Sequence, residues 1–332
     1  MNVAEIGEFG LIKLLAEMVG KEAPPDKDLI LSMGDDTAAW KSRGLIQLAT
    51  TDTLVQNVHF DLKYTDWQEL GHKAIAVSLS DIAAMGGIPQ YALVALSLPR
   101  ETLVENVTGL YRGMIQIASR YNVQIIGGNI TSAGEVVINV SLTGYLNDKN
   151  PMLRSGAEPG DQIAITGHTG LSAAGAAMLK HDMKIEGDSA ALFRKAQLQP
   201  EPRVSEGQLL QKRGVKAAID ISDGLLADLR HICTASNVSA RIRTELIPIH
   251  PFLKKHFPEQ ALDFALAGGE DYELLFCADA KKMAAIKQEL VHPLNIIGEI
   301  GLFPPGKVEV LDEDNNDLML NFAGWEHFKS ST

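Results

Sequence analysis

Aspartates beside glycine, serine or threonine recur along this 332-residue chain and are its residues best suited to chemistry. They occur in four motifs: Gly34-Asp35-Asp36, Thr50-Thr51-Asp52, Ser80-Asp81 and Asp220-Ile221-Ser222-Asp223. Apolar segments lead into these motifs, which predicts carboxylates at the edge of packed structure and not on a solvated helix face. The alternative interpretation is that each aspartate is a turn or helix-cap residue.

Several carboxylates gathered at one place repel one another strongly unless cations neutralise them. Magnesium is the natural cation, because it takes oxygen ligands and leaves coordination positions open for substrate phosphates. The four motifs together therefore favour a magnesium site that binds a phosphorylated ligand.

Glycine turns are a second feature, because their backbone N–H groups can bind an anion. The candidates are Gly127-Gly128-Asn129 and the segment from Gly167 to Gly170, which precedes a predicted helix. Basic side chains stand beside the motifs, namely Lys73, Arg154 and Arg203. Arg154 could clamp a phosphate or be a solvated surface arginine, and His59 could contact a ligand or be structural.

Several classes of protein are disfavoured by what the sequence contains. It has no GxxxxGK[ST] motif, no protein-kinase motif set, and no HExxH or paired CxxC. A net charge of −12 without a basic run argues against nucleic acid or an anionic membrane as partner. Cys233 and Cys277 lie in apolar contexts typical of reduced, buried cysteines. With no signal-peptide pattern and no apolar run near ~20 residues, a cytoplasmic location is expected.

Alternating strands and helices must position these residues, which indicates an α/β or α+β protein. Strands are expected at 29–33, 45–51, 91–99, 123–129, 135–146, 162–167 and 294–300, and within 216–224 and 265–276. Helices are expected at 8–19, 68–85, 101–121, 171–180 and 225–235, and after 203. The strand at 45–51 should end at Asp52, and the strand at 123–129 should run into a glycine turn.

The length of the chain favours two domains. Asparagine, proline and glycine cluster at 147–160, where a boundary is expected. The predicted domains are residues 1–150 and 151–332.

Longer motifs resemble the thiamine-monophosphate kinase family, in the family's order and nearly from end to end of the chain. They are GEFGLI (7–12), MGDDTA (33–38), TTDTLVQNVHF (50–60), SLSDIAAMGGIP (78–89), RSGAEPGD (154–161), TGHTGLSAAG (166–175), DISDGLLADL (220–229), ALAGGEDYELLF (265–276) and GWEHF (324–328). This resemblance implies a two-domain fold of the aminoimidazole-ribonucleotide-synthetase type. It also implies a homodimer built through the N-terminal domains, and ATP and several Mg²⁺ in a cleft lined by aspartates.

The resemblance also assigns roles to individual residues. The implied metal ligands are Asp36, Thr50, Thr51, Asp52, Asp81, Asn129, Asp220 and Asp223. The implied ATP contacts are Tyr111, Gly128, Asn129, Arg154 and Ser222. His59, Glu270 and Trp325 would line the thiamine site. Many members of the family carry Asp where this chain has Asn129, and an amide can still coordinate magnesium but brings no charge.

The implied reaction is transfer of the ATP γ-phosphoryl group to the phosphate of thiamine monophosphate. No general base is expected, because a phosphate monoester with a second pKa of about 6 is already largely a dianion near neutral pH. The alternatives are another ATP-dependent enzyme of the same superfamily, such as an aminoimidazole-ribonucleotide synthetase, or a non-catalytic nucleotide-binding module. Selenophosphate synthetases and hydrogenase-maturation relatives fit less well, because they use an N-terminal or C-terminal cysteine that this chain lacks.

Overall fold

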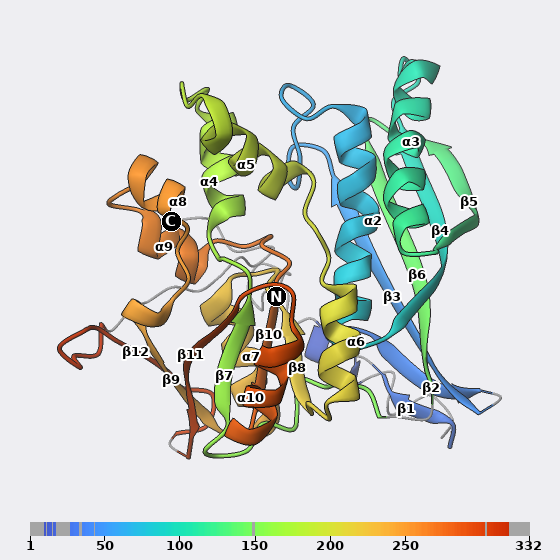
Figure 1. Ribbon diagram of the computed structural model, residues 1–332. Coiled ribbons are helices and arrows are strands. Elements are labelled where there is room, and N and C mark those ends of the chain that lie inside the picture. The colour runs from blue at the N-terminus through green and yellow to red at the C-terminus, as the bar shows by residue number, and fades with distance from the viewer. Residues whose placement is uncertain are drawn as a thin grey trace.

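The computed structural model describes residues 10, 12–14, 16–17, 27–32, 35–42, 44–147, 150–302 and 304–318. Within these ranges the chain forms two six-stranded sheets with helices between and around them (Figure 1). No described helix is both long enough and apolar enough to cross a membrane. Half of the predicted helix at 8–19, and Trp325, lie outside the described residues, and the described residues 10, 12–14 and 16–17 are helical.

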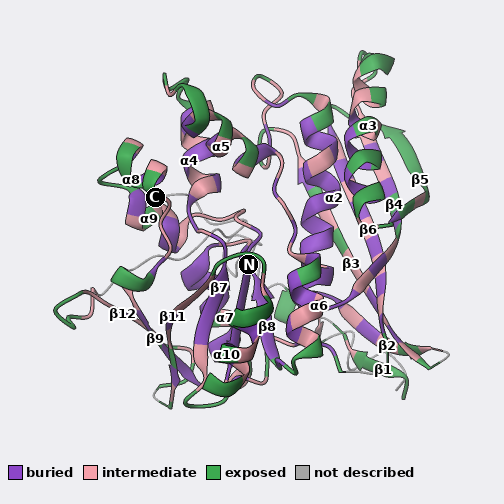
Figure 2. Ribbon diagram, viewed as in Figure 1, coloured by how far each residue is buried: buried purple, intermediate pink, exposed green. Residues whose placement is uncertain are grey.

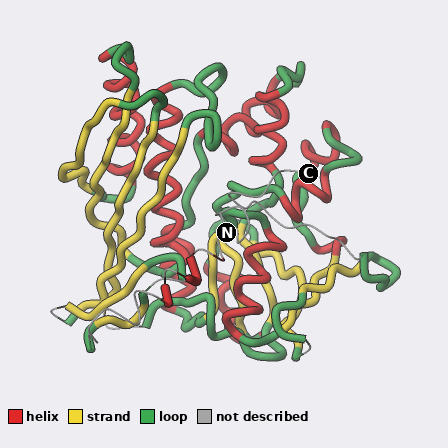
Figure 3. The backbone as a smooth tube through the Cα atoms, turned by 180° about the vertical axis from the view of Figure 1, so that it is seen from behind, coloured by secondary structure: helices red, strands yellow, loops and turns green. Residues whose placement is uncertain are grey.

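The first sheet has the strand order β1-β2-β3-β6-β4-β5. Its strands are β1 (Leu29–Leu31), β2 (Ala38–Ser42), β3 (Leu45–Val55), β4 (Ile88–Leu98), β5 (Gln124–Ser132) and β6 (Val137–Asn147). β4 and β5 are parallel and are joined through a helix, whereas the other pairs are antiparallel. The helices α2 (Trp67–Ala84) and α3 (Val104–Arg120) cover one face, and Figure 3 shows the strands in front of them from the other side.

The second sheet has the order β12-β9-β11-β7-β10-β8. Its strands are β7 (Gln162–Thr166), β8 (Ala217–Asp220), β9 (Ser239–Arg243), β10 (Leu274–Ala278), β11 (Leu294–Gly301) and β12 (Val308–Leu311). The accompanying helices are α4 (Leu171–Lys180), α5 (Gly187–Leu198), α6 (Val204–Lys212), α7 (Leu225–Ser236), η1 (Thr244–Leu246), α8 (Pro251–His256), α9 (Ala261–Ala267) and α10 (Ala280–Glu289).

Both faces of this second sheet are buried. Successive side chains of a strand point to opposite faces, so they join different cores. On β10, Leu275 and Cys277 join the core that contains α7, while Leu274 and Phe276 join the core that contains α2 and α10. A single core cluster therefore runs from the first sheet through α2 into the second sheet.

Helix α2 lies between the two sheets, where it contacts β3 and β6 of one and β8 of the other. Fourteen of its 18 residues are buried, which is why it is almost wholly purple in Figure 2. Asp66 starts the helix with a capping box, accepting hydrogen bonds from the N–H groups of Gln68 and Glu69 at 2.8 Å each. Because α2 lies between the two sheets, Ser78, Ser80 and Asp81 near its C-terminal end lie between the two halves of the molecule.

The predicted fold class is confirmed, and so are the helices predicted at 68–85 and 171–180. Two local predictions are wrong. β3 continues past Asp52 to Val55, and β5 continues through the glycine pair at 127–128 instead of turning there. The pairing of β4 with β5 is irregular beside Gly127, and a Cβ on Gly128 would lie 1.8 Å from the Val94 carbonyl oxygen. Gly127 therefore lies at an irregularity in the strand pairing, and Gly128 allows the backbones of β4 and β5 to approach closely.

Candidate active site

Three aspartates from separate elements meet at the junction of the two halves. Asp36 precedes β2, Asp81 belongs to α2, and Asp220 ends β8. One carboxylate oxygen from each lies within 4.8 Å of the others. Asp36 and Asp220 are buried, so this aspartate cluster is enclosed by packed structure as the apolar flanks of the motifs predicted.

Hydroxyl groups hold the carboxylates in place. The Ser80 hydroxyl donates to Asp220 Oδ2 at 2.6 Å, and the Thr50 hydroxyl donates to Asp81. Asp52 lies next to the cluster on β3, where its Oδ2 accepts a 2.6 Å hydrogen bond from Ser78. Each hydroxyl fixes an orientation but brings no positive charge.

Arg154 contributes a cation on one side of the aspartate cluster. Its Nη2 donates to Asp36 Oδ1 at 2.6 Å, and its backbone N–H donates to the carboxylate of Asp35. The other oxygen of Asp36, Oδ2, is buried and has no hydrogen-bond partner among the described residues. A buried, unsatisfied carboxylate oxygen is costly and is expected where a ligand completes the site.

The pKa values of carboxylates in the aspartate cluster are raised. Burial raises the pKa of Asp81 well above its ordinary value, and the carboxylates of Asp52 and Asp220 raise it further. Burial raises the pKa of Asp220 to about 7, against the lowering effect of the Ser80 hydroxyl. Burial first, and the neighbouring carboxylates second, thus oppose ionisation of this cluster, and added positive charge would favour it.

A second acidic group lies where β8 turns into α7. Ligand atoms of Asp223, Asp228 and His231 lie within 4.8 Å of one another. Asp228 is occupied locally, because its Oδ2 accepts the N–H groups of residues 222–224 at 3.1 Å each. Burial lowers the pKa of His231 to about 4, so its imidazole is neutral at ordinary pH.

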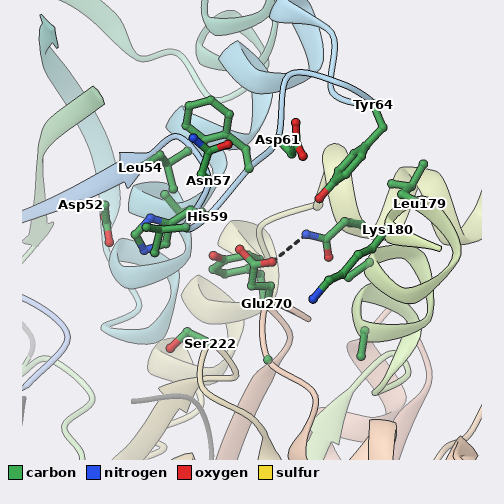
Figure 4. A pocket seen from close by; sticks show the side chains of 18 of the residues that line it. Asp52, Leu54, Asn57, His59, Asp61, Tyr64, Leu179, Lys180, Ser222 and Glu270 are labelled. Carbon is green, nitrogen blue, oxygen red and sulfur yellow. Dashed lines mark hydrogen bonds between the residues drawn. The ribbon is translucent and has the colours of Figure 1, made fainter. Parts of the chain in front are cut away.

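A cavity of about 1150 Å³ opens beside these carboxylates. Asp52, His59, Asp223 and Glu270 line it, and Figure 4 labels three of them, Asp52, His59 and Glu270. The rest of the wall is partly apolar, with Leu54, Val77, Ala173, Ala176 and Leu179. The cavity thus combines carboxylates, suited to cations, with apolar side chains suited to a ring system.

His59 has a fixed tautomer in this cavity. The Val55 backbone N–H donates to His59 Nδ1 at 3.0 Å, so Nδ1 is the acceptor and the ring hydrogen of the neutral imidazole is on Nε2. His59 is therefore a hydrogen-bond donor through Nε2.

The structure brings together most of the residues selected from the sequence. The aspartate cluster and its supports contain Asp36, Thr50, Asp52, Asp81, Asp220 and Arg154. The cavity is lined by Asp52, His59, Ser222, Asp223 and Glu270. Loops, strands and helix α2 from both halves supply them, so they could not have been grouped by spacing alone.

Other selected residues lie elsewhere. Thr51 lines the cavity beside Asp52, but its hydroxyl is exposed and contacts Ser141 of β6, on the side of the sheet away from α2. In the strand register, Asp52 is opposite Val140, Val140 is opposite Val94, and Val94 is opposite Gly128. Three strand spacings amount to roughly 14 Å. Within one chain, Gly128 and Asn129 are thus separated from Asp52, and Tyr111 lies on α3 against the core.

The glycine turn at 167–170 has an internal carboxylate beside it. Asp271 Oδ2 accepts the N–H of Gly170 at 2.7 Å, and Oδ1 accepts the N–H of Ser172 at 3.3 Å. These two N–H groups at the start of α4 are therefore engaged within the protein, and a role of this turn in phosphate binding stays a prediction.

Sequence reasoning named Asp35 only as part of a motif, and it did not single out Gln197 or Asp228. Asp35 and Asp228 stand inside the quoted motifs 33–38 and 220–229, so their proximity to the site could have been noticed. Gln197 lies in α5, which the sequence reading did not predict.

Comparisons with known proteins agree with this geometry. Residues 34–146 match the family model of AIR synthase related protein, N-terminal domain, and residues 158–303 match that of the C-terminal domain. The thiamine-monophosphate kinase of Escherichia coli K12 is 37% identical over 97% of this chain and 98% of its own. That of Bacillus subtilis is 36% identical over 90% of this chain and 94% of its own.

Solved structures of other proteins have a similar fold. AaThiL complexed with AMPPCP and TMP superposes with a TM-score of 0.86 at 31% identity, covering 98% of this chain and 99% of that one. The hydrogenase maturation protein HypE in complex with ATP has a TM-score of 0.69 at 17% identity, over 92% of each chain, which indicates a shared fold alone.

Proposed function

The chain belongs to the thiamine-monophosphate kinase family, and we propose that it transfers the γ-phosphoryl group of ATP to the phosphate of thiamine monophosphate. The observation that carries this proposal is the aspartate cluster of Asp36, Asp81 and Asp220 beside a cavity large enough for a phosphorylated ring compound. A relative solved with AMPPCP, an ATP analogue, and TMP supports the same pair of substrates.

Magnesium is the cation that we assign to this site. The unsatisfied Oδ2 of Asp36 and the raised pKa values of Asp81 and Asp220 fit hard-cation binding, because a cation would satisfy the oxygen and favour ionisation. The proposed ligands are Asp36, Thr50, Thr51, Asp52, Asp81, Asn129, Asp220 and Asp223, of which Thr51 and Asn129 rest on the family resemblance. When bound, magnesium neutralises phosphate charge.

The side chains of the protein position two anions against each other. At an effective dielectric of 20, two unit charges at ~4 Å repel by about 4 kcal/mol, and several such pairs meet in this reaction. Arg154 holds Asp36 and is available to the nucleotide phosphates, with Ser222, Tyr111, Gly128 and Asn129 as further proposed ATP contacts. No aspartate needs to remove a proton, because the acceptor phosphate is already ionised.

His59 and Glu270 bind the organic part of the substrate in this proposal. His59 lines the cavity with Nε2 as its donor nitrogen, and Glu270 lines it with acceptor oxygens. Trp325, which lies outside the described residues, is kept as a third contact on the resemblance alone.

A homodimer and a cytoplasmic location belong to the same proposal, together with domains at 1–150 and 151–332. Tyr91 and Leu93 of β4 and Ile126 of β5 are exposed apolar residues. Their neighbours Ala92, Val94 and Ile125 face the core. The three exposed residues therefore project from the face opposite α2 and α3. An apolar sheet face of this kind suits a second copy of the chain. Two free, buried cysteines suit a reducing compartment.

The direct test is to incubate the purified protein with ATP, Mg²⁺ and thiamine monophosphate and to identify the products. We expect ADP and thiamine diphosphate, and neither thiamine nor formylglycinamidine ribonucleotide should replace thiamine monophosphate as second substrate. Turnover of formylglycinamidine ribonucleotide would favour the synthetase alternative. ATP binding without any product would favour the non-catalytic alternative.

A further inference from the structure

Glu270 is held from several directions, although it belongs to a loop. Its backbone φ is 63°, a left-handed conformation that an L-residue adopts at a cost and only where its surroundings impose it. The Glu270 N–H donates to the Ser222 carbonyl oxygen at 2.8 Å, which ties the loop to the turn that carries Asp223. The backbone is therefore fixed before the side chain is considered.

Two buried side chains then fix the carboxylate. Lys73 Nζ lies 2.8 Å from Glu270 Oε1, and the lysine side chain is 1% exposed. Gln197 Nε2 donates to Glu270 Oε2 at 2.8 Å, the contact drawn as a dashed line in Figure 4. Each oxygen of Glu270 thus has one partner inside the protein and one lone pair left for a ligand in the cavity.

The partners are themselves anchored on rigid elements. Lys73 lies in the middle of α2, the helix packed between the two sheets. The Ser172 hydroxyl donates to Gln197 Oε1 at 2.6 Å, which fixes the orientation of the amide so that Nε2 points to Glu270. Glu270 is consequently supported from α2 on one side and from α5 on the other.

Burying a lysine is costly unless a carboxylate compensates it, so the position of Lys73 requires an explanation. We infer that Lys73 and Gln197 are positioning residues that hold Glu270 in the orientation that receives thiamine monophosphate. This inference rests on the proposed function and deepens it, since it assigns two residues to substrate recognition that the sequence reading did not.

The role of Lys73 predicts a selective kinetic change. Lys73→Met keeps the unbranched stem of the side chain, one atom shorter, and removes the charge. The KM for thiamine monophosphate should rise about tenfold, the effect of removing the cation that is ion-paired with Glu270. The KM for ATP should stay within about twofold, because Lys73 does not contact the aspartate cluster. Lys73→Arg, which retains a donor, should recover part of the loss.

The test is a double-mutant cycle with Glu270→Gln, read by kinetics and by calorimetric binding of thiamine monophosphate. If Lys73 acts through Glu270, Lys73→Met should change binding less than twofold in the Glu270→Gln background. Gln197→Leu should likewise weaken binding in the wild-type background. Lys216→Met is the matched control, because it removes an exposed lysine paired with Glu158 and should have no effect.

Any of three results would overturn the positioning role. The first is that the effects of Lys73→Met and Glu270→Gln are additive, and the second is that Lys73→Met binds thiamine monophosphate as tightly as the wild type or more tightly. The third is that the KM values for both substrates increase equally. Binding of thiamine monophosphate by the wild type without turnover would instead contradict the proposed reaction alone, because the binding cycle would still report on Lys73. If Lys73→Met did not fold, Lys73→Arg and Gln197→Leu would decide the question by the same cycle.

Discussion

Asp81 faces two opposing demands at the scale of the single residue. It is surrounded by packed structure and by the carboxylates of Asp52 and Asp220, all of which favour its neutral form. To bind a cation it must nevertheless be ionised. A bound divalent ion would reconcile these demands, so the carboxylates that repel one another are the ones to which we assign the metal.

Asp81→Asn should therefore affect stability in opposite directions with and without magnesium. Without metal, the variant should have a higher melting temperature than the wild type, because one member of a repelling buried group is neutralised. With Mg²⁺, the wild type should gain stability, by about 2.7 kcal/mol at a hundredfold excess over Kd, and the variant should gain much less. Differential scanning calorimetry in EDTA and in MgCl₂ measures both. An equal magnesium effect in the two proteins would remove Asp81 from the metal site.

The two cysteines should be unreactive in the folded protein. Burial raises the pKa of Cys233 to about 12 and that of Cys277 well above its ordinary value. Because the thiolate is the nucleophile, a raised pKa means that at pH 8 both thiols stay protonated. Iodoacetamide at pH 8 should label neither residue in the native protein and both in guanidinium chloride, as read by mass spectrometry. Rapid labelling of the native protein would contradict the described burial.

Residue types made the aspartate cluster predictable, but not the pairings that support the cavity. Asp36, Asp81 and Asp220 stood out because carboxylates beside apolar segments have few other uses. Lys73 was noticed as a basic residue near a motif, but its partner Glu270 is 197 positions away and in the other half of the chain. Pairings of this kind depend on how the two halves pack, which local patterns do not encode.

Helix α2 is the element that positions the site, and glycines determine how closely it is packed. A Cβ on Gly113 of α3 would lie 1.9 Å from the Gln68 carbonyl oxygen, and one on Gly207 of α6 would lie 2.0 Å from the Ala83 carbonyl oxygen. Both neighbours thus touch the α2 backbone directly. This close approach explains why a glycine in the middle of a helix is retained despite its low helix propensity.

Two glycine-to-alanine changes in the same helix should have opposite effects. Gly113→Ala should lower the free energy of unfolding by about 2 kcal/mol or more, because α2 and α3 must separate to admit the methyl group. Gly109→Ala should raise it by about 1 kcal/mol, because its Cβ would meet only Trp67 at 3.5 Å and alanine favours helix. Urea unfolding of both variants measures the difference. A Gly113→Ala protein as stable as the wild type would show that the helices are not in close contact.

Elements with a strong pattern were predicted well, and elements whose pattern depends on tertiary contacts were not. α2 was predicted to within one residue at each end, although burial on all sides blurs its periodicity. The glycines of β5 suggested a turn because glycine usually marks one, whereas here they allow a close approach of β4. The short elements α5, α8 and β12 gave no pattern that distinguishes them from loops.

At the scale of the whole molecule, the open face of the first sheet should be a subunit interface. Light scattering after gel filtration should give a mass twice the 35.9 kDa of one chain. Leu93→Asp should produce a monomer, because a charge would be buried in the apolar contact. Val291→Asp is the matched control, since Val291 is 94% exposed and lies in the other half. A monomeric wild type, or dimers from both variants, would exclude this interface.

The two halves of the chain share a core, so the site at their junction is part of the folded structure and not a contact between loosely linked domains. Met152, Val204 and Phe276 of the second half pack in one cluster with residues of the first sheet. The sequence indicated two units and a boundary near 147–160, but it contained no indication that α2 joins them. The arrangement of the aspartates depends on that joint packing.

The most direct test of the central claim is to follow the γ-phosphoryl group itself. ATP labelled at the γ-phosphate is mixed with thiamine monophosphate, Mg²⁺ and either the wild type or Asp220→Asn. We predict that in the wild type the label appears in the terminal phosphate of thiamine diphosphate, one equivalent for each ADP formed. In Asp220→Asn this transfer should fall by at least about a hundredfold, because the aspartate cluster loses a ligand. Label found only in inorganic phosphate, or equal transfer by the two proteins, would contradict the account.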